Sequence, residues 1–147
     1  MMKRVLFAVA VAAIVPGLGA CNSLGRQPRL SDPSIKPHKL VAGDSPVITV
    51  KLTDRFDIVS DIEATLKEDP KRKFILKDDG VPPDKVAHDG IWSTQANVLL
   101  SPPPGTFTLE ISAHNKKGEI IRVRTSKTET GPLTVTCPFS IEAPQQQ

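Results

Sequence analysis

The segment GTFTLEISAH, residues 105–114, decides the fold class. Apolar side chains occupy every second position in it, and threonine, glutamate and serine stand between them. The apolar positions are Phe107, Leu109, Ile111 and Ala113. A period of two places these side chains on one face of a β-strand, whereas a helix needs a period near 3.6. We therefore expect a strand with one buried face.

Shorter segments with the same alternation lie on both sides of this strand. Asn115-Lys116-Lys117-Gly118 follows it directly and predicts a hairpin turn, with Gly118 in the left-handed conformation. Asp79-Gly80 and Asp89-Gly90 predict further turns, and Pro102–Gly105 predicts an extended connector. About seven strands result, and this pattern predicts an all-β fold, a β-sandwich. They cover parts of residues 48–53, 58–66, 74–76, 92–98, 107–113, 121–123 and 133–141. A helix over residues 57–67 is the alternative for the second of them.

The first twenty residues have the layout of a secretory signal peptide. Lys3 and Arg4 precede an uncharged apolar run, Val5–Val15, and Pro16-Gly17 stands before small residues. Eleven helical residues rise roughly 16 Å, which is too short for a bilayer core of about 30 Å. The run therefore favours a cleaved signal over a transmembrane helix.

Leu18-Gly19-Ala20-Cys21 resembles the lipobox of bacterial lipoproteins, in which an apolar residue and two small residues precede the modified cysteine. The resemblance implies cleavage before Cys21, lipidation of its thiol and attachment to a membrane facing an oxidising compartment. Asn22 follows, where an aspartate would be the usual inner-membrane retention signal. The cell envelope is the expected location, with the outer membrane favoured if the host is Gram-negative. Ordinary secretion with a free thiol is the alternative.

Four parts of the chain are expected: a signal peptide (1–20), a lipidated flexible tether (21–44), a sandwich (45–141) and a disordered tail (142–147). Without residues 1–20 the chain has 17 basic and 16 acidic residues, a formal net charge of +1. So balanced a charge argues against a nucleic-acid partner. Lys71-Arg72-Lys73 is a short basic cluster that could touch anionic lipid or polysaccharide, or simply be solvated.

The middle of the chain resembles a known group of domains. Residues 75–80 read ILKDDG, Asp84 follows, and residues 87–92 read AHDGIW. This segment is similar to the L-x-D-D-G…D…A-G-D-G-[IV]-[YW] segment of bacterial extracellular immunoglobulin-like domains. PGTFTL at 104–109 and AHNKKG at 113–118 resemble a hairpin of the same domains. The resemblance covers roughly residues 45–125 and implies an immunoglobulin-like sandwich used for adhesion, spacing or ligand display. Pro83 and His88 depart from the family pattern, where glycine often stands.

The acidic loop is the one concentration of chemistry in the sequence. Calcium needs six to eight oxygen ligands on a bent backbone, and clustered aspartates beside glycines supply them. The candidate ligands are Asp78, Asp79, Asp84 and Asp89. The alternative is a pair of Asp-Gly turns whose carboxylates accept backbone N–H groups, with Asp84 solvated. The spacing does not match an EF-hand loop.

No other constellation indicates catalysis. His88, Asp89 and Ser93 could be imagined as a hydrolytic trio, but neighbours on a strand point to opposite faces. Cys137 lies in an apolar alternation and is interpreted as a buried thiol, with an intermolecular disulfide or a nucleophile as alternatives. We expect a non-enzymatic envelope lipoprotein whose domain contacts protein partners or acts as a spacer. The alternative is a calcium-braced module that binds a ligand or carbohydrate.

Overall fold

The computed structural model describes residues 26–97 and 103–143. The predicted signal peptide, Cys21 and most of the predicted tail lie outside these residues. Ten strands make up the described fold: β1 (Arg29–Lys36), β2 (Lys39–Leu40), β3 (Val47–Thr53), β4 (Asp61–Leu66), β5 (Lys73–Leu76), β6 (Ile91–Gln95), β7 (Gly105–His114), β8 (Arg122–Arg124), β9 (Thr130–Pro132) and β10 (Thr134–Ile141). Within this part of the chain, no helix has the length and apolar character needed to cross a membrane.

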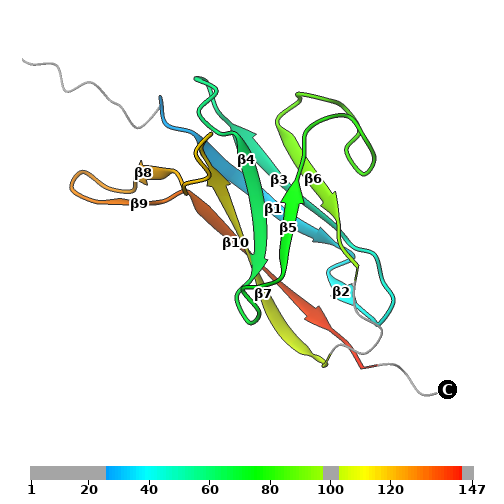
Figure 1. Cartoon of the computed structure of the whole chain (residues 1–147). Coiled ribbons are helices and arrows are strands. Elements are labelled where there is room, and N and C mark those ends of the chain that lie inside the picture. The colour runs from blue at the N-terminus through cyan, green and yellow to red at the C-terminus, as the bar shows by residue number, and fades with distance from the viewer. Residues whose placement is uncertain (1–25, 98–102, 144–147) are drawn as a thin grey trace, which may run out of the picture.

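The strands form a sandwich of two main sheets (Figure 1). One sheet has the order β1-β3-β6, and the other has the order β2-β10-β7-β4-β5. A small ribbon, β8-β9, extends from the side of the sandwich. Strand β7 lies between β10 and β4. The two N-terminal strands belong to different sheets: β1 pairs with β3 in the first sheet, and β2 pairs in parallel with β10 in the second. This is the order of an immunoglobulin-like sandwich, so the predicted all-β fold class is confirmed.

The core lies between the two sheets, and the alternating strand of residues 105–114 is central to it. In β7, Leu109 is 1% exposed and Ile111 and Ala113 are 0% exposed. Ile48 and Val50 of β3 enter the same core from the opposite sheet. Apolar burial of this kind contributes about 1.5–3 kcal/mol for each large side chain. The prediction of a strand with a period of two is therefore confirmed here.

The turn after β7 also forms as predicted. Gly118 has φ +78°, and the side-chain oxygen of Asn115 accepts the N–H groups of Lys117 and Glu119 at 2.9 and 3.1 Å. Residues 61–66 are the strand β4, so the alternative of a helix over 57–67 is wrong. Strand β6 ends at Gln95, short of the predicted Val98, which lies outside the described residues.

The prediction of a flexible tether over residues 21–44 is wrong for residues 29–40. Strand β1 pairs with β3 along its length, and Leu30 and Ile35 are each 5% exposed. A bulge between Ser31 and Ser34 shifts the register, with Asp32 at φ 52°. The bulge changes which positions face inward, so buried Leu30 and Ile35 are an odd number of residues apart and the alternation is hidden. The sandwich therefore spans 29–141 rather than 45–141.

Candidate functional site

The acidic loop joins β5 to β6 and is held by its glycines. Gly80 and Gly90 have φ of +73° and +84°, conformations that residues with a Cβ rarely adopt. A Cβ on Gly90 would lie 2.9 Å from the carbonyl oxygen of Leu52, so the backbone of the loop approaches β3 closely at this point. The N–H of Leu52 donates to the carbonyl oxygen of Gly90 at 2.8 Å. The loop is thus fixed against the end of the three-stranded sheet.

Backbone N–H groups of the loop donate to its carboxylates. Asp78 accepts from Asp89 and Gly90 at 3.2 and 2.9 Å. Asp84 accepts from Gly80 and Val86 at 2.6 and 3.4 Å. Asp79 and Asp89 each accept from the residue two positions later, Val81 and Ile91. These are the turn-capping bonds that the sequence offered as the alternative to calcium.

Three of the four predicted calcium ligands come together. Carboxylate oxygens of Asp78, Asp84 and Asp89 lie within 4.8 Å of one another, and Asp79 is not part of the group. The interpretation of Asp84 as solvated is wrong, because it is only 5% exposed. The loop folds over the outer face of the three-stranded sheet, so Asp84 lines a cleft of about 310 Å³ together with Thr49 and Ser93.

Ser93 is a part of this site that the sequence did not indicate. Its hydroxyl is buried and has no hydrogen-bond partner among the described residues, with the side chain 4% exposed. Ser93 lies on the outer face of β6, opposite Thr49 of β3, where alternation predicts a solvated position. Lys36 and Lys85 also line the cleft and bring positive charge to it. Two acidic residues (Asp84 and Asp89), two lysines and the unpartnered hydroxyl of Ser93 are therefore brought together at this cleft.

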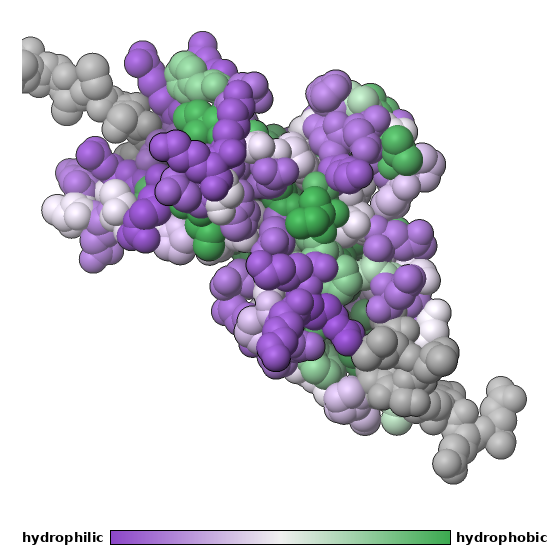
Figure 2. All heavy atoms as spheres, viewed as in Figure 1, coloured by the Kyte–Doolittle hydropathy of each residue, from purple (hydrophilic) through white to green (hydrophobic). Residues whose placement is uncertain are grey.

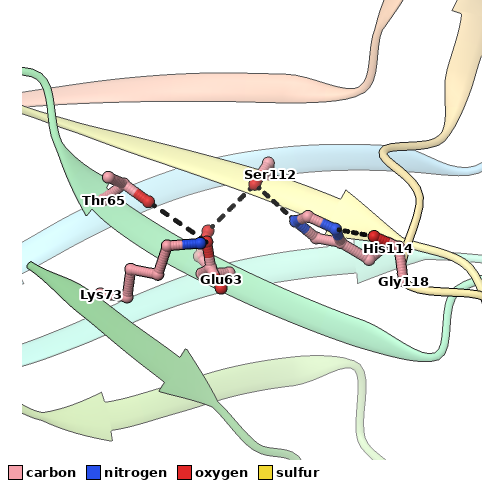
Figure 3. A network of polar contacts seen from close by, with 6 residues as sticks. All are labelled: Glu63, Thr65, Lys73, Ser112, His114 and Gly118. Atoms are coloured by element: carbon pink, nitrogen blue, oxygen red, sulfur yellow. Dashed lines mark hydrogen bonds and ion pairs between the residues drawn. The ribbon is translucent and has the colours of Figure 1, made fainter. Parts of the chain in front are cut away.

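The imagined trio of His88, Asp89 and Ser93 does not form. His88 is exposed at φ 60°, Asp89 bonds to the N–H of Ile91, and the Ser93 hydroxyl bonds to neither. A different serine–histidine pair lies on the outer face of the five-stranded sheet (Figure 3). The hydroxyl of Ser112 is 3.0 Å from Nε2 of His114, and Nδ1 of His114 is 3.2 Å from the carbonyl oxygen of Gly118. The i, i+2 spacing on one strand was the signal for this pair.

The serine–histidine pair belongs to a polar network that fastens strands together. Ser112 also donates to the carbonyl oxygen of Glu63 at 3.4 Å, and Glu63 forms an ion pair with Lys73 at 3.0 Å (Figure 3). These contacts link β7, β4 and β5. Ser112 is 7% exposed and does not line the cleft beneath the acidic loop, so its hydroxyl is largely closed to a substrate. The arrangement therefore indicates structure rather than nucleophilic chemistry.

A small apolar cavity of about 50 Å³ lies between the sheets at the end away from the acidic loop. Leu40, Ile48, Leu109 and Phe139 line it, together with Arg72. Its volume is that of a packing defect and is far below the 300–1,000 Å³ of ordinary ligand pockets.

The basic cluster Lys71-Arg72-Lys73 is divided between two ion pairs: Arg72 pairs with Asp69 at 3.9 Å, whereas Lys73 pairs with Glu63.

Cys137 is a buried thiol, as predicted. It is 7% exposed on β10 and forms no disulfide within the described part of the chain. Burial raises its pKa above the ordinary value of 9.0, and a backbone hydrogen bond from Ile35 lowers it by less. The thiolate is the reactive form, so this cysteine is poorly placed as a nucleophile. Trp92 is partly buried and packs against the core.

No protein-family model and no curated protein matches the chain. Among solved structures, the chain is similar to a Niemann-Pick type C2 protein from Japanese carpenter ant. The two share 18% sequence identity and superpose with a TM-score of 0.42, over 79% of this chain and 92% of the other.

Proposed function

We propose that this chain is an exported lipoprotein, cleaved before Cys21 and lipidated there, whose β-sandwich is a non-catalytic protein-interaction or spacer module in the cell envelope. The anchor is supported by the likeness of Leu18–Cys21 to a lipobox. The proposal of a non-catalytic module is supported by how its polar side chains form hydrogen bonds. The acidic loop and the Ser112–His114 pair both direct their hydrogen bonds to the backbone of the fold.

Metabolic labelling with an alkyne palmitate tests the anchor. The wild-type chain and a Cys137→Ala variant should take up the label and float with membranes. A Cys21→Ser variant should lose both the label and the flotation. Label on the Cys21→Ser chain, or an unlabelled wild-type chain in the soluble fraction, would contradict lipidation at Cys21.

The second candidate function is a calcium-braced binding module. Its support is the grouping of Asp78, Asp84 and Asp89 within 4.8 Å, beside the unpartnered hydroxyl of Ser93 in the same cleft. Carboxylates at this spacing repel one another, and a divalent cation would offset that repulsion. Such an ion would brace the loop that covers the outer face of β3 and β6.

Calcium titration followed by thermal melting separates the two candidates. For a bound ion, the melting temperature rises with calcium and returns with chelator. Asp89→Asn should abolish the shift, because Asp89 belongs to the group. Asp79→Asn is the matched control, since Asp79 makes the same type of turn bond from outside the group. A melting temperature that ignores calcium and chelator excludes the calcium-braced module.

A further inference from the structure

The chain enters the sandwich very close to the predicted lipid. The side-chain amide of Gln27 donates to the carbonyl oxygen of Arg124 at 3.3 Å, and its oxygen accepts the N–H of Arg124. Gln27 is six peptide links after Cys21, and these span at most roughly 21 Å when fully extended. Since β1 is part of the fold, the anchor has no long tether.

Three segments meet at the end where the chain enters. Strand β1 begins at Arg29 opposite Thr53, so the β3–β4 loop lies beside it. The N–H of Ser60 donates to the carbonyl oxygen of His114 at 2.8 Å, which joins this loop to the turn after β7. We call residues 26–29, 54–60 and 115–130 the entry face. On one side of it Arg29, Thr53 and Arg124 line a common cleft.

Apolar side chains are exposed on the entry face. Phe56 is 54% exposed, Ile58 is 42% exposed and Ile120 is 46% exposed. Figure 2 shows hydrophobic surface among hydrophilic side chains at this end of the molecule, beside the point where the N-terminal segment enters. Transfer of exposed isoleucine and phenylalanine side chains from water to an apolar environment is favourable, so these residues favour contact with an apolar surface.

The charge of the entry face is positive. Its segments contain eight basic and four acidic residues, a formal net charge of +4, whereas the whole chain after residue 20 has only +1. Arg55 precedes Phe56, and Lys116-Lys117 lies shortly before Ile120. Among the acidic residues, Asp54 accepts hydrogen bonds through its carboxylate from the N–H groups of Phe56 and Val59. Apolar tips flanked by basic side chains are the composition of surfaces that lie in the headgroup region of anionic bilayers.

We propose that the entry face docks on the anionic lipid surface that holds the lipid of Cys21, with Phe56 and Ile58 entering the headgroup region. The inference rests on the proposed lipidation, because the short connection keeps the entry face beside the bilayer. Docking fixes the orientation of the sandwich, so the turn with Lys71-Arg72 and the C-terminal end of β10 point away from the membrane.

Tryptophan fluorescence in vesicles tests the docking. The full lipidated chain is placed in vesicles of brominated phosphatidylcholine with about 30% phosphatidylglycerol, which gives an anionic surface. The bromine quenches the fluorescence of any tryptophan that enters the bilayer. Phe56→Trp adds a reporter on the entry face, and Val41→Trp adds one at the opposite end. Val41 is 42% exposed, so both reporters begin in water. The parent chain, whose only tryptophan packs against the core, gives the background.

The Phe56→Trp signal should be quenched strongly, and the Val41→Trp signal should not. Lys116→Gln/Lys117→Gln should weaken the docking equilibrium roughly fivefold for each lysine removed. Lys39→Gln/Lys71→Gln removes two charges from exposed side chains at the other end and should leave quenching unchanged. Equal quenching of both reporters would contradict docking of the entry face and leave the lipid anchor intact. The same conclusion follows if neither reporter is quenched in a chain that floats with the vesicles. A chain that does not float overturns docking together with the lipid anchor.

Discussion

The amide N–H of Gly80 donates to the carboxylate of Asp84 at 2.6 Å, and Asp84 is the one charged side chain that is buried in the described part of the chain. A second N–H, from Val86, reaches the same carboxylate at 3.4 Å. The buried charge therefore fastens both arms of the acidic loop. Hydrogen bonds to a charged group contribute about 1.5–3 kcal/mol, more than neutral ones.

Replacing Asp84 should destabilise the domain. Asp84→Ala leaves the N–H of Gly80 without its partner, and we expect a loss of about 2 kcal/mol in the free energy of unfolding. Urea unfolding followed by the fluorescence of Trp92 measures it. Asp79→Ala is the control, because its single bond to Val81 is exposed and its loss should cost about 0.5 kcal/mol or less. Equal losses in the two variants would contradict the anchoring role of Asp84.

The conformation of Gly90 gives a second prediction. Gly90→Ala should destabilise by at least about 1 kcal/mol more than Gly118→Ala. Both glycines have positive φ, +84° and +78°, so both substitutions carry similar backbone strain. Only at Gly90 would the new Cβ also meet an atom, the oxygen of Leu52 at 2.9 Å. The difference between the two melting curves therefore isolates the clash, and indistinguishable curves would mean that the loop moves freely away from β3.

Much of this loop could be predicted from the sequence, because the two Asp-Gly turns are local features. The grouping of Asp78, Asp84 and Asp89 without Asp79 could not, since it depends on how the backbone between the turns folds back. Burial of Ser93 was equally hidden. Alternation places it on the outer face of β6, and only the loop lying across that face removes it from water.

The boundaries of the domain show the same limit. Strands β3, β7 and β10 keep a regular period of two, and the sequence predicts them well. Strand β1 contains Asp32-Pro33 at its bulge, so its buried residues lose that period. Proline and serine then give the segment the composition of a linker.

Truncating the core residues of β1 tests whether this segment belongs to the fold. Leu30→Ala and Ile35→Ala should each cost about 2–4 kcal/mol, as for other buried aliphatic side chains. Val41→Ala is the control from an exposed position just beyond β2 and should change stability by less than about 0.5 kcal/mol. If the β1 variants unfold at the same urea concentration as the parent chain, residues 29–36 act as a tether after all.

The stability of the domain should fall at alkaline pH partly through Cys137. Burial raises the pKa of its thiol in the folded state, so the unfolded chain releases the proton first as pH rises. The contribution is fully present below the ordinary thiol pKa of 9.0 and is lost as pH rises from there through the higher pKa of the folded state. Cys137→Ala lacks this group, so its free energy of unfolding should decline less steeply above about pH 9. Parallel pH profiles for the two chains would show that the thiol ionises equally in both states.

Reaction with a thiol reagent under native conditions gives an independent readout of the burial of Cys137. The buried thiol should react slowly until urea unfolds the sandwich.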